Sequence, residues 1–237
     1  MPPIAGPGAP GGADRALVPA RLRRALPVYA TAAVLAVLAV GLRVHGHTRA
    51  SRLDRWVDAR LAVDGHPWHG LIYLLAQIGS AQIAAVIGLA LAGLCWWWRD
   101  RWSALLCVLA PAADDALTEG ILKPVVGRTK VGAFAYPSGH AGRAMAVATV
   151  AILLAGASGP LGRRLPHAGR RTVQLVAGAA GAGVGLAVVA LGWHYATDAA
   201  AGALLATSVT LVVAVLIDHG RTRWPASPWV RSPVTAS

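Results

Sequence analysis

Long apolar blocks, separated by short polar segments, run along most of this 237-residue chain. A helix rises about 1.5 Å per residue, so about 20 apolar residues cross the ~30 Å hydrocarbon core of a bilayer. The pattern therefore predicts an all-α fold, a polytopic bundle of about six transmembrane helices. The expected spans are residues 28–43, a stretch within 69–98 that breaks near Gly79 and Ser80, and residues 102–123, 138–156, 172–193 and 196–217.

Residues 51–63, between the first two predicted spans, have a different pattern. Four apolar residues recur there at helical spacing, with charged residues between them. This spacing predicts an amphipathic helix at the membrane interface, although an ordinary solvated connecting helix fits equally well. The apolar positions are Leu53, Trp56, Val57 and Leu61.

Three regions follow from the same pattern. Residues 1–25 are rich in Pro, Gly, Ala and Arg and are expected to form a disordered, basic cytoplasmic tail. Residues 26–217 form the membrane-embedded domain, and residues 218–237 form a second basic cytoplasmic tail. No small-residue cleavage site follows the first apolar block, so we expect a retained helix and not a signal peptide.

The composition agrees with a membrane protein. Hydrophobic residues make up 56% of the chain and charged residues only 14%, with a mean hydropathy of +0.54. The net charge of +12 would suggest nucleic acid in a soluble protein. Here the arginines lie in short loops, as the positive-inside rule expects, which predicts cytoplasmic termini and no nucleic-acid partner. Cys95 and Cys107 fall in apolar blocks, so no disulfide is expected.

A cationic segment follows the third predicted span. The only two lysines of the chain, Lys123 and Lys130, lie there together with Arg128. Three cations within eight residues create a local field for an anion. Charged side chains that extend from a helix end to the membrane surface are the alternative interpretation.

The next polar segment, Tyr-Pro-Ser-Gly-His at residues 136–140, opens the fourth predicted span. Ser138 is a favourable N-cap, and Gly139 has no side chain to obstruct a ligand. The unpaired N–H groups of the first turn can then bind a phosphate. His140 lies in that turn, where it can exchange a proton with the bound group.

A third segment, residues 192–198, precedes the sixth predicted span. His194 and Asp198 are four residues apart, so on a helix they share a face. A carboxylate that accepts from one imidazole nitrogen leaves the other nitrogen free to attack. The predicted topology returns this histidine to the membrane face that carries Lys123 and His140.

These three segments resemble the motifs of the type 2 phosphatidic acid phosphatase family, which shares its core with the vanadium haloperoxidases. That family carries Lys-x6-Arg-Pro, then Pro-Ser-Gly-His, then Ser-Arg-x5-His-x3-Asp. The order of the motifs and the loop lengths match, and the resemblance extends over roughly residues 54–217.

The resemblance implies hydrolysis of a lipid phosphate or diphosphate, either polyprenyl or glycerolipid, at the extracytoplasmic membrane face. The reaction would pass through a phosphohistidine, without a metal or another cofactor. His194 would be the nucleophile, Asp198 would orient it, and His140 would protonate the leaving group. The phosphate would be bound by Lys123, Arg128, Lys130, Ser138, Gly139 and Arg143.

Two positions depart from the family pattern. Lys130-Val131 stands where the family has Arg-Pro, and Ala187-Val188 stands where it has Ser-Arg. Arg143, one turn after His140 in an apolar helix, is expected to supply the missing cation. It can equally form an ion pair with a carboxylate of the third span. Those carboxylates are Asp114, Asp115 and Glu119, of which Glu119 is also placed for an i,i+4 pair with Lys123.

Three other functions compete with a phosphatase. A phosphotransferase would pass the same phosphohistidine to an alcohol. A catalytically impaired member would bind lipid phosphates only, but such a protein has no use for the nucleophile His194. A transporter is disfavoured because no inverted repeat with broken half-helices is present. The oligomeric state is not predicted.

Overall fold

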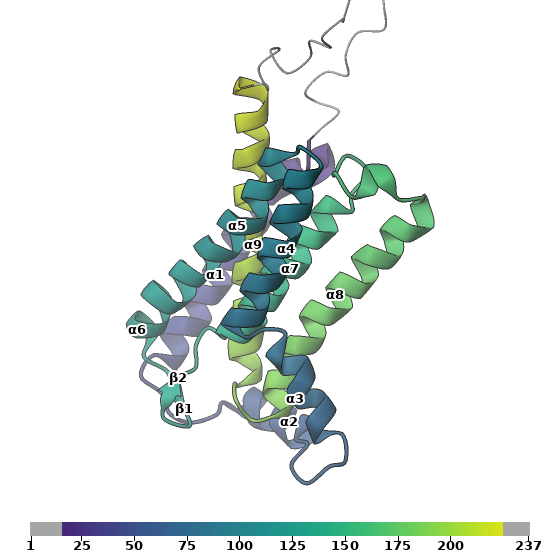
Figure 1. The fold of residues 1–237 in the computed structure, drawn as a ribbon. Helices are drawn as coiled ribbons and strands as arrows, with labels where there is room; N and C mark the ends of the chain where they lie inside the picture. Colours follow the sequence, from purple (N-terminus) through teal and green to yellow (C-terminus); the bar gives the residue numbers. More distant parts are fainter. Residues whose placement is uncertain (1–15, 225–237) are drawn as a thin grey trace, which may run out of the picture.

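The computed structural model describes residues 16–224 as a bundle of helices with one short hairpin (Figure 1). Thr129 pairs with Phe134 in the antiparallel hairpin. The predicted all-α membrane fold is confirmed. The elements are α1 (Ala20–Val44), α2 (Arg52–Leu61), α3 (His69–Gln77), α4 (Ala81–Trp97), α5 (Arg101–Asp115), the π-helix η2 (Ala116–Leu122), α6 (Lys123–Val126), β1 (Thr129–Lys130), β2 (Ala133–Phe134), α7 (Gly139–Leu154), the short 3-10 helix η3 (Gly162–Arg164), α8 (His167–Ala190) and α9 (Ala196–Arg223).

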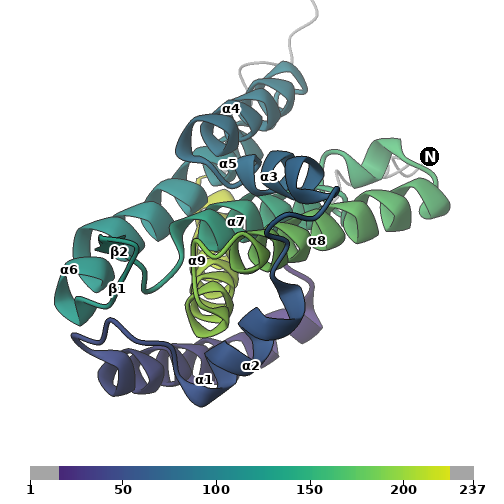
Figure 2. The ribbon, with the colours of Figure 1, turned by 90° about the horizontal axis from the view of Figure 1, so that it is seen from below.

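Helix α7 lies in the middle of the bundle, between α8, α9, α5 and α4 (Figure 2). The glycines of α8 make part of this packing possible. A Cβ at Gly181 would lie 3.0 Å from the Cβ of Ala148 on α7, and Gly178 and Gly185 face the same helix. Small residues at helical spacing allow two membrane helices to approach closely. The first turn of α7 is thereby held among four neighbouring helices.

Three helices, α1, α8 and α9, are each long and apolar enough to cross a membrane. The helices α3 and α4 meet this test only as a pair, bent by 54° at their junction. The two other predicted spans are also helical, but α7 has 16 residues, and the helix formed by α5 and η2 carries several carboxylates. The helical stretches are therefore confirmed, whereas six crossings stay a prediction.

The break between α3 and α4 lies where the sequence predicted it, at Gly79 and Ser80. Ser80 caps α4 by accepting a hydrogen bond from the N–H of Ile83. A side chain at Gly79 would collide with the carbonyl oxygen of His140. The break therefore lets the backbone of this span lie directly against the first turn of α7.

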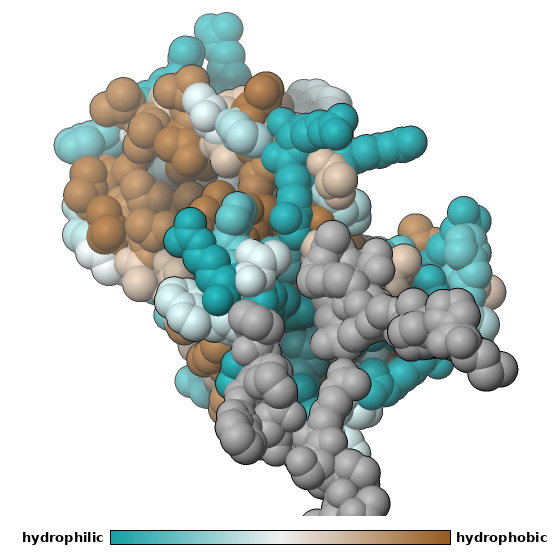
Figure 3. Space-filling view, turned by 90° about the horizontal axis from the view of Figure 1, so that it is seen from above, coloured by the Kyte–Doolittle hydropathy of each residue, from teal (hydrophilic) through white to brown (hydrophobic). Residues whose placement is uncertain are grey.

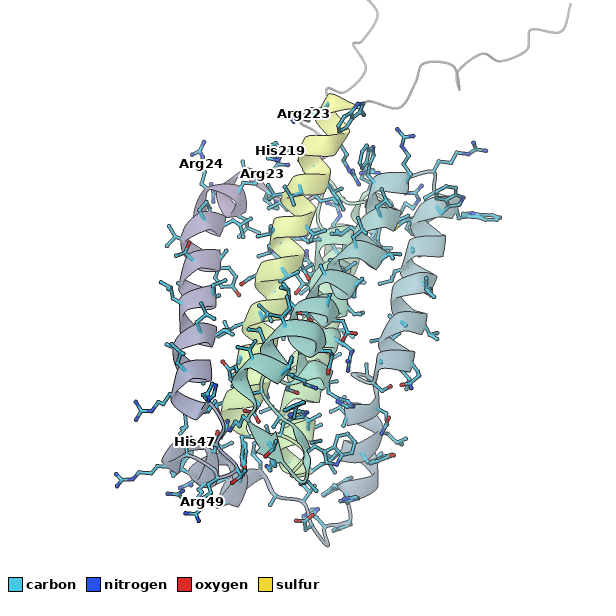
Figure 4. The ribbon with its side chains drawn as sticks, turned by 90° about the vertical axis from the view of Figure 1, so that its left-hand side faces the viewer. Arg23, Arg24, His47, Arg49, His219 and Arg223 are labelled. Atoms are coloured by element: carbon cyan, nitrogen blue, oxygen red, sulfur yellow. The ribbon has the colours of Figure 1, made fainter. Side chains whose placement is uncertain are left out.

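The first and last described helices begin and end at the same end of the bundle (Figure 4). Figure 4 labels Arg23, Arg24, His219 and Arg223 at that end, and His47 and Arg49 at the opposite end. In the view onto the first of these ends, hydrophobic side chains gather along one flank and hydrophilic ones extend at the rim (Figure 3).

The expected boundaries of the two tails are wrong by several residues. Helix α1 begins at Ala20. The N–H groups of Leu17 and Val18, just before it, donate to the carboxylate of Asp218 on α9. Arg23 donates to the same carboxylate. These contacts order the chain before residue 25 and extend α9 to Arg223. The remaining tail predictions fall on residues 1–15 and 225–237, outside the described residues.

Helix α2 forms where the amphipathic helix was predicted. Ser51 and Asp54 form a capping box at its start. Val57 and Leu61 pack against the bundle, whereas Leu53 and Trp56 are exposed. The predicted helix is thus confirmed, and its position at a membrane interface stays a prediction.

Candidate active site

Two histidines from distant segments meet at the end of the bundle opposite to the described termini. His140 lies in the first turn of α7, and His194 lies in the turn between α8 and α9. Their ring centroids are 6.3 Å apart, and the ring of Trp193 lies against His140. His194 is 7% exposed. The predicted convergence of these two motifs is confirmed.

The imidazole of His194 is oriented by backbone. Its Nδ1 lies 2.9 Å from the carbonyl oxygen of Ala135. A carbonyl oxygen only accepts, so Nδ1 carries the proton and Nε2 keeps its lone pair in the neutral ring. Lys130 Nζ donates to the carbonyl oxygen of His194 at 3.0 Å, which fixes the backbone of the same residue. This tautomer suits a nucleophile.

The expected contact between Asp198 and His194 is wrong. The prediction placed both residues on one helix, but α9 begins at Ala196, so His194 precedes it. Asp198 instead accepts from the N–H of Tyr195 at 3.0 Å and pairs with Arg128 at 2.5 Å. Asp198 therefore positions the turn that carries the nucleophile and does not bind its ring.

Arg128 lies between two carboxylates in a fully buried cluster. Its guanidinium is 2.7 Å from Asp54 Oδ2 and 2.5 Å from Asp198 Oδ1, and it also donates to the hydroxyl of Thr197. All three charged side chains are 0% exposed. We call Asp54, Arg128 and Asp198 the carboxylate clamp. Two carboxylates bind this guanidinium in the structure, and the contact of Arg128 with phosphate stays a prediction.

Asp54 was missed as a site residue. Its only signal in the sequence is the spacing Ser51-x-x-Asp54, which indicates a capping box. Burial alone would raise the pKa of Asp54, but the hydrogen bonds from Arg128, Thr197 and Ser51 outweigh it and lower the pKa to about 2. The clamp therefore contains an ionised carboxylate throughout the neutral and mildly acidic range.

Lys123 and Arg143 share one carboxylate oxygen. Glu119 Oε1 accepts from Lys123 Nζ at 2.8 Å and from Arg143 at 2.9 Å. Arg143 also pairs with Asp115 at 2.7 Å. The predicted pair between Glu119 and Lys123 is confirmed, as is the alternative that Arg143 pairs with carboxylates of this helix. Contact between Arg143 and phosphate stays a prediction.

The start of α7 has the predicted cap. Ser138 Oγ accepts from the N–H of Ala141, and its contact with phosphate stays a prediction. A side chain at Gly139 would collide with the Oε1 atom of Glu119, and Arg143 lies close by. One carboxylate oxygen thus lies among two cations and a helix N-terminus. This surrounding is suited to an anion such as a phosphate.

The departures from the family pattern have structural counterparts. Val188, which stands where the family has arginine, is 0% exposed and packs in an apolar cluster with Ala144 and Ala187. The cation of the family pattern is therefore replaced here by an apolar contact. Lys130 lies over the ring of Tyr195 and 3.6 Å from Asp58. In this structure Lys130 therefore hydrogen-bonds to the backbone of the turn that carries His194, and its contact with phosphate stays a prediction.

The protonation state of His194 gives a pH prediction. Burial, and then the positive charge of Lys123, lower the pKa of His194 to about 3. The ring is therefore neutral above about pH 4. In a profile of kcat/KM against pH, corrected for ionisation of the substrate, we expect no acid limb from His194 above that pH.

Replacing Lys123 removes a charge that lowers the pKa of His194. The pKa should therefore rise in Lys123→Met, and the acid limb should move to higher pH. Arg60→Met, which removes an exposed cation at the same end, is the matched control and should leave the limb in place. An acid limb at the same pH in Lys123→Met and in the unmodified chain would contradict the assignment.

Residues 114–221 match the family model of the PAP2 superfamily, a range that holds all three motifs but not Asp54 of the clamp. Among residues 16–224, no group of three or more His, Cys, Asp or Glu side chains is arranged to hold a metal ion. The family-model match and the helical bundle confirm the predicted resemblance to the PAP2 superfamily.

A solved structure shares this fold. The chain is similar to the first transmembrane PAP2 type phosphatidylglycerolphosphate phosphatase from Bacillus subtilis, with a TM-score of 0.67 and 20% sequence identity. The match covers 80% of this chain and 96% of the other. No curated protein matches the sequence.

Proposed function

We propose that this protein hydrolyses a lipid phosphate or diphosphate through a phosphohistidine, without a metal ion, at the extracytoplasmic membrane face. The observation that carries this proposal is the pair of facing histidines, 6.3 Å apart, beside two cations at a helix N-terminus. Nucleophile, proton donor and anion site then meet in one place.

In the first step, Nε2 of His194 attacks the phosphorus atom. The bond from phosphorus to the leaving oxygen breaks, and His140 transfers its ring proton to that oxygen. Negative charge on the phosphoryl oxygens is stabilised by Lys123, Arg143 and the first N–H groups of α7. The phosphoryl oxygens would take the place beside Lys123 and Arg143 that Glu119 Oε1 has in this structure.

In the second step, water attacks the phosphorus of the phosphohistidine. His140 accepts a proton from this water, the P–N bond breaks, and His194 becomes neutral again. The product is inorganic phosphate when a monoester is the substrate. His140 thus acts as acid in one step and as base in the other.

The distribution of arginines supports the proposed side of the membrane. The end with the described termini carries Arg24, Arg99, Arg101, Arg163 and Arg171, among others. Positive residues favour the cytoplasm, so the opposite end, which holds the histidines, faces outward. The proposed substrate is a polyprenyl or a glycerolipid phosphate, and the similarity to a phosphatidylglycerolphosphate phosphatase supports a glycerolipid.

The test is phosphate release from a panel of lipid phosphates and diphosphates by detergent-purified protein, with chelator and without added metal. We expect release from at least one lipid and retention of the rate in chelator. A rate that falls with chelator and returns with a divalent metal would contradict the metal-independent reaction. No release from any lipid by folded protein would favour a lipid-phosphate binding protein.

A phosphotransferase using the same intermediate is the alternative. The two reactions differ only in the group that attacks the phosphohistidine. Assays with an added lipid alcohol separate them, because a transferase forms a new phosphate ester while a hydrolase releases inorganic phosphate under the same conditions.

Arg143 is expected to replace the missing arginine of the third motif. Arg143→Ala should reduce kcat at least tenfold, because one cation is lost where negative charge develops. Arg143→Lys should recover part of the rate. The matched control is Asp115→Asn, which breaks one of the two ion pairs of Arg143 and leaves the guanidinium in place. If Arg143→Ala and Asp115→Asn reduce kcat equally, the ion pair between Arg143 and Asp115 accounts for the loss, and contact between Arg143 and phosphate does not.

A further inference from the structure

A second cavity lies at the active-site end, behind the carboxylate clamp. It has a volume of about 940 Å³ and opens between the C-terminal end of α1, the following loop and the start of α2. Neither His140 nor His194 lines it, so it is separate from the site described above. Its lining residues are Val40, Arg43, Val44, Gly46, His47, Thr48, Arg49, Ala50, Ser51, Arg52, Leu53, Arg128 and Thr197. We call it the α1–α2 cavity.

Three arginines line the cavity without being neutralised. Arg43, Arg49 and Arg52 are exposed, and their side chains make no ion pair or hydrogen bond within residues 16–224. No carboxylate lines the cavity. Figure 4 shows Arg49 and His47 together at this end of the bundle. Uncompensated guanidinium groups around a concave surface favour a phosphate or another anion.

The cavity also has an apolar side. Val40, Val44 and Leu53 line it beside the arginines. One turn below them, on the side of α1 that carries Val40 and Arg43, Ala36 and Ala39 are exposed along the predicted membrane span. An anion held by the arginines would therefore continue into a surface suited to acyl chains. This combination distinguishes a lipid from a free phosphate ion.

We propose that the α1–α2 cavity binds the head group of an anionic phospholipid, with its acyl chains along α1. The arginines lie at the outer end of a span, where lipid phosphates lie in a bilayer. The inner wall is formed by Arg128 and Thr197, which also hold the segment before His194. The bound lipid thus contacts a wall of the clamp and not the reacting groups.

Binding is tested with His194→Ala protein, so that the catalytic site cannot turn over a ligand. Short-chain phosphatidylglycerol is titrated into the protein in neutral detergent and followed by calorimetry, with phosphatidylcholine and inorganic phosphate as separate arms. We expect one saturable site for phosphatidylglycerol and at least tenfold weaker binding of the other two. Equal binding of inorganic phosphate would replace the lipid by a free anion and overturn the proposal.

Two variants locate the site. Arg43→Gln/Arg49→Gln/Arg52→Gln removes the charges, and Ala50→Trp fills the cavity while keeping them. Each should weaken binding at least tenfold. The matched control, Arg24→Gln/Arg171→Gln/Arg223→Gln, changes the net charge equally at the opposite end and should bind within about twofold of the parent.

Several outcomes would overturn this site. Equal losses in the control variant would assign the binding to net charge. Unchanged binding in Ala50→Trp would assign it to surface arginines outside the cavity. The folding of each variant is checked by its thermal midpoint without lipid, and phosphate release by the same variants with active His194 confirms an intact catalytic site.

Discussion

Replacing His194 with alanine should reduce phosphate release from a lipid phosphate to background, a loss of about 10³-fold or more. The ring lies beside the anion site with Nε2 unprotonated, because Nδ1 donates to the carbonyl oxygen of Ala135. Alanine removes the group that forms the covalent intermediate in the proposed reaction, and water cannot replace it from the same position. The measurement is initial-rate phosphate release at saturating substrate.

A comparison of two substrates separates His194 from His140. With a nitrophenyl phosphate, the leaving group needs little protonation, so loss of the general acid should matter much less in the first step. His140→Ala should then still release a first equivalent of nitrophenol as a burst, while its turnover of lipid phosphate is lost. His194→Ala should show no burst with either substrate. Quenching the His140 variant in alkaline detergent should trap a phosphoprotein that is stable to base and loses its phosphate in acid.

The matched control is His69→Ala. His69 is an exposed histidine at the start of α3, at the same end of the bundle, and the proposed reaction gives it no role. The rate of phosphate release by His69→Ala should stay within about twofold of the rate of the unmodified chain. A His194→Ala protein that is folded and still forms the phosphoprotein would assign the nucleophile to another residue.

The sequence alone predicts the parts of this site that depend on local geometry. Ser138 and Gly139 begin a helix because a hydroxyl caps it and a missing side chain leaves space, and both features are properties of neighbouring residues. Glu119 and Lys123 are four residues apart on one helix, and their pair survives even though the helix widens into a π-helix there. The break at Gly79 and Ser80 follows from the same kind of signal.

The clamp could not be predicted, because its contacts join distant segments. Asp54 lies 74 residues before Arg128, and Arg128 lies 70 residues before Asp198. No periodicity connects them. The error at Asp198 has a definite origin. An i,i+4 rule was applied across a helix start, and His194 lies two residues before α9 and so off its helical face. A residue's partner thus depends on where a helix begins, which is the least certain feature of a sequence-based assignment.

The second large effect concerns the stability of the fold. Arg128→Leu should destabilise the protein by about 3–5 kcal/mol, because it leaves Asp54 and Asp198 buried without their cation. For a chain of this size, the thermal midpoint should fall by roughly 6–20 °C. Cys95 and Cys107 are free and buried, as predicted, so their reaction with a thiol-reactive dye reports unfolding in detergent.

The reason for this loss is electrostatic, and a compensated variant tests it. Adding Asp54→Asn and Asp198→Asn to Arg128→Leu removes both uncompensated charges and should recover a large part of the midpoint. Arg55→Leu, which removes an exposed arginine of α2, is the matched control and should change stability by at most about 0.5 kcal/mol. If the triple variant is no more stable than Arg128→Leu, the loss comes from packing and not from buried charge.

Because Asp54 has a pKa of about 2, below the ordinary 3.8, the clamp should stabilise the unmodified chain above about pH 4 and lose that contribution as the pH falls toward 2.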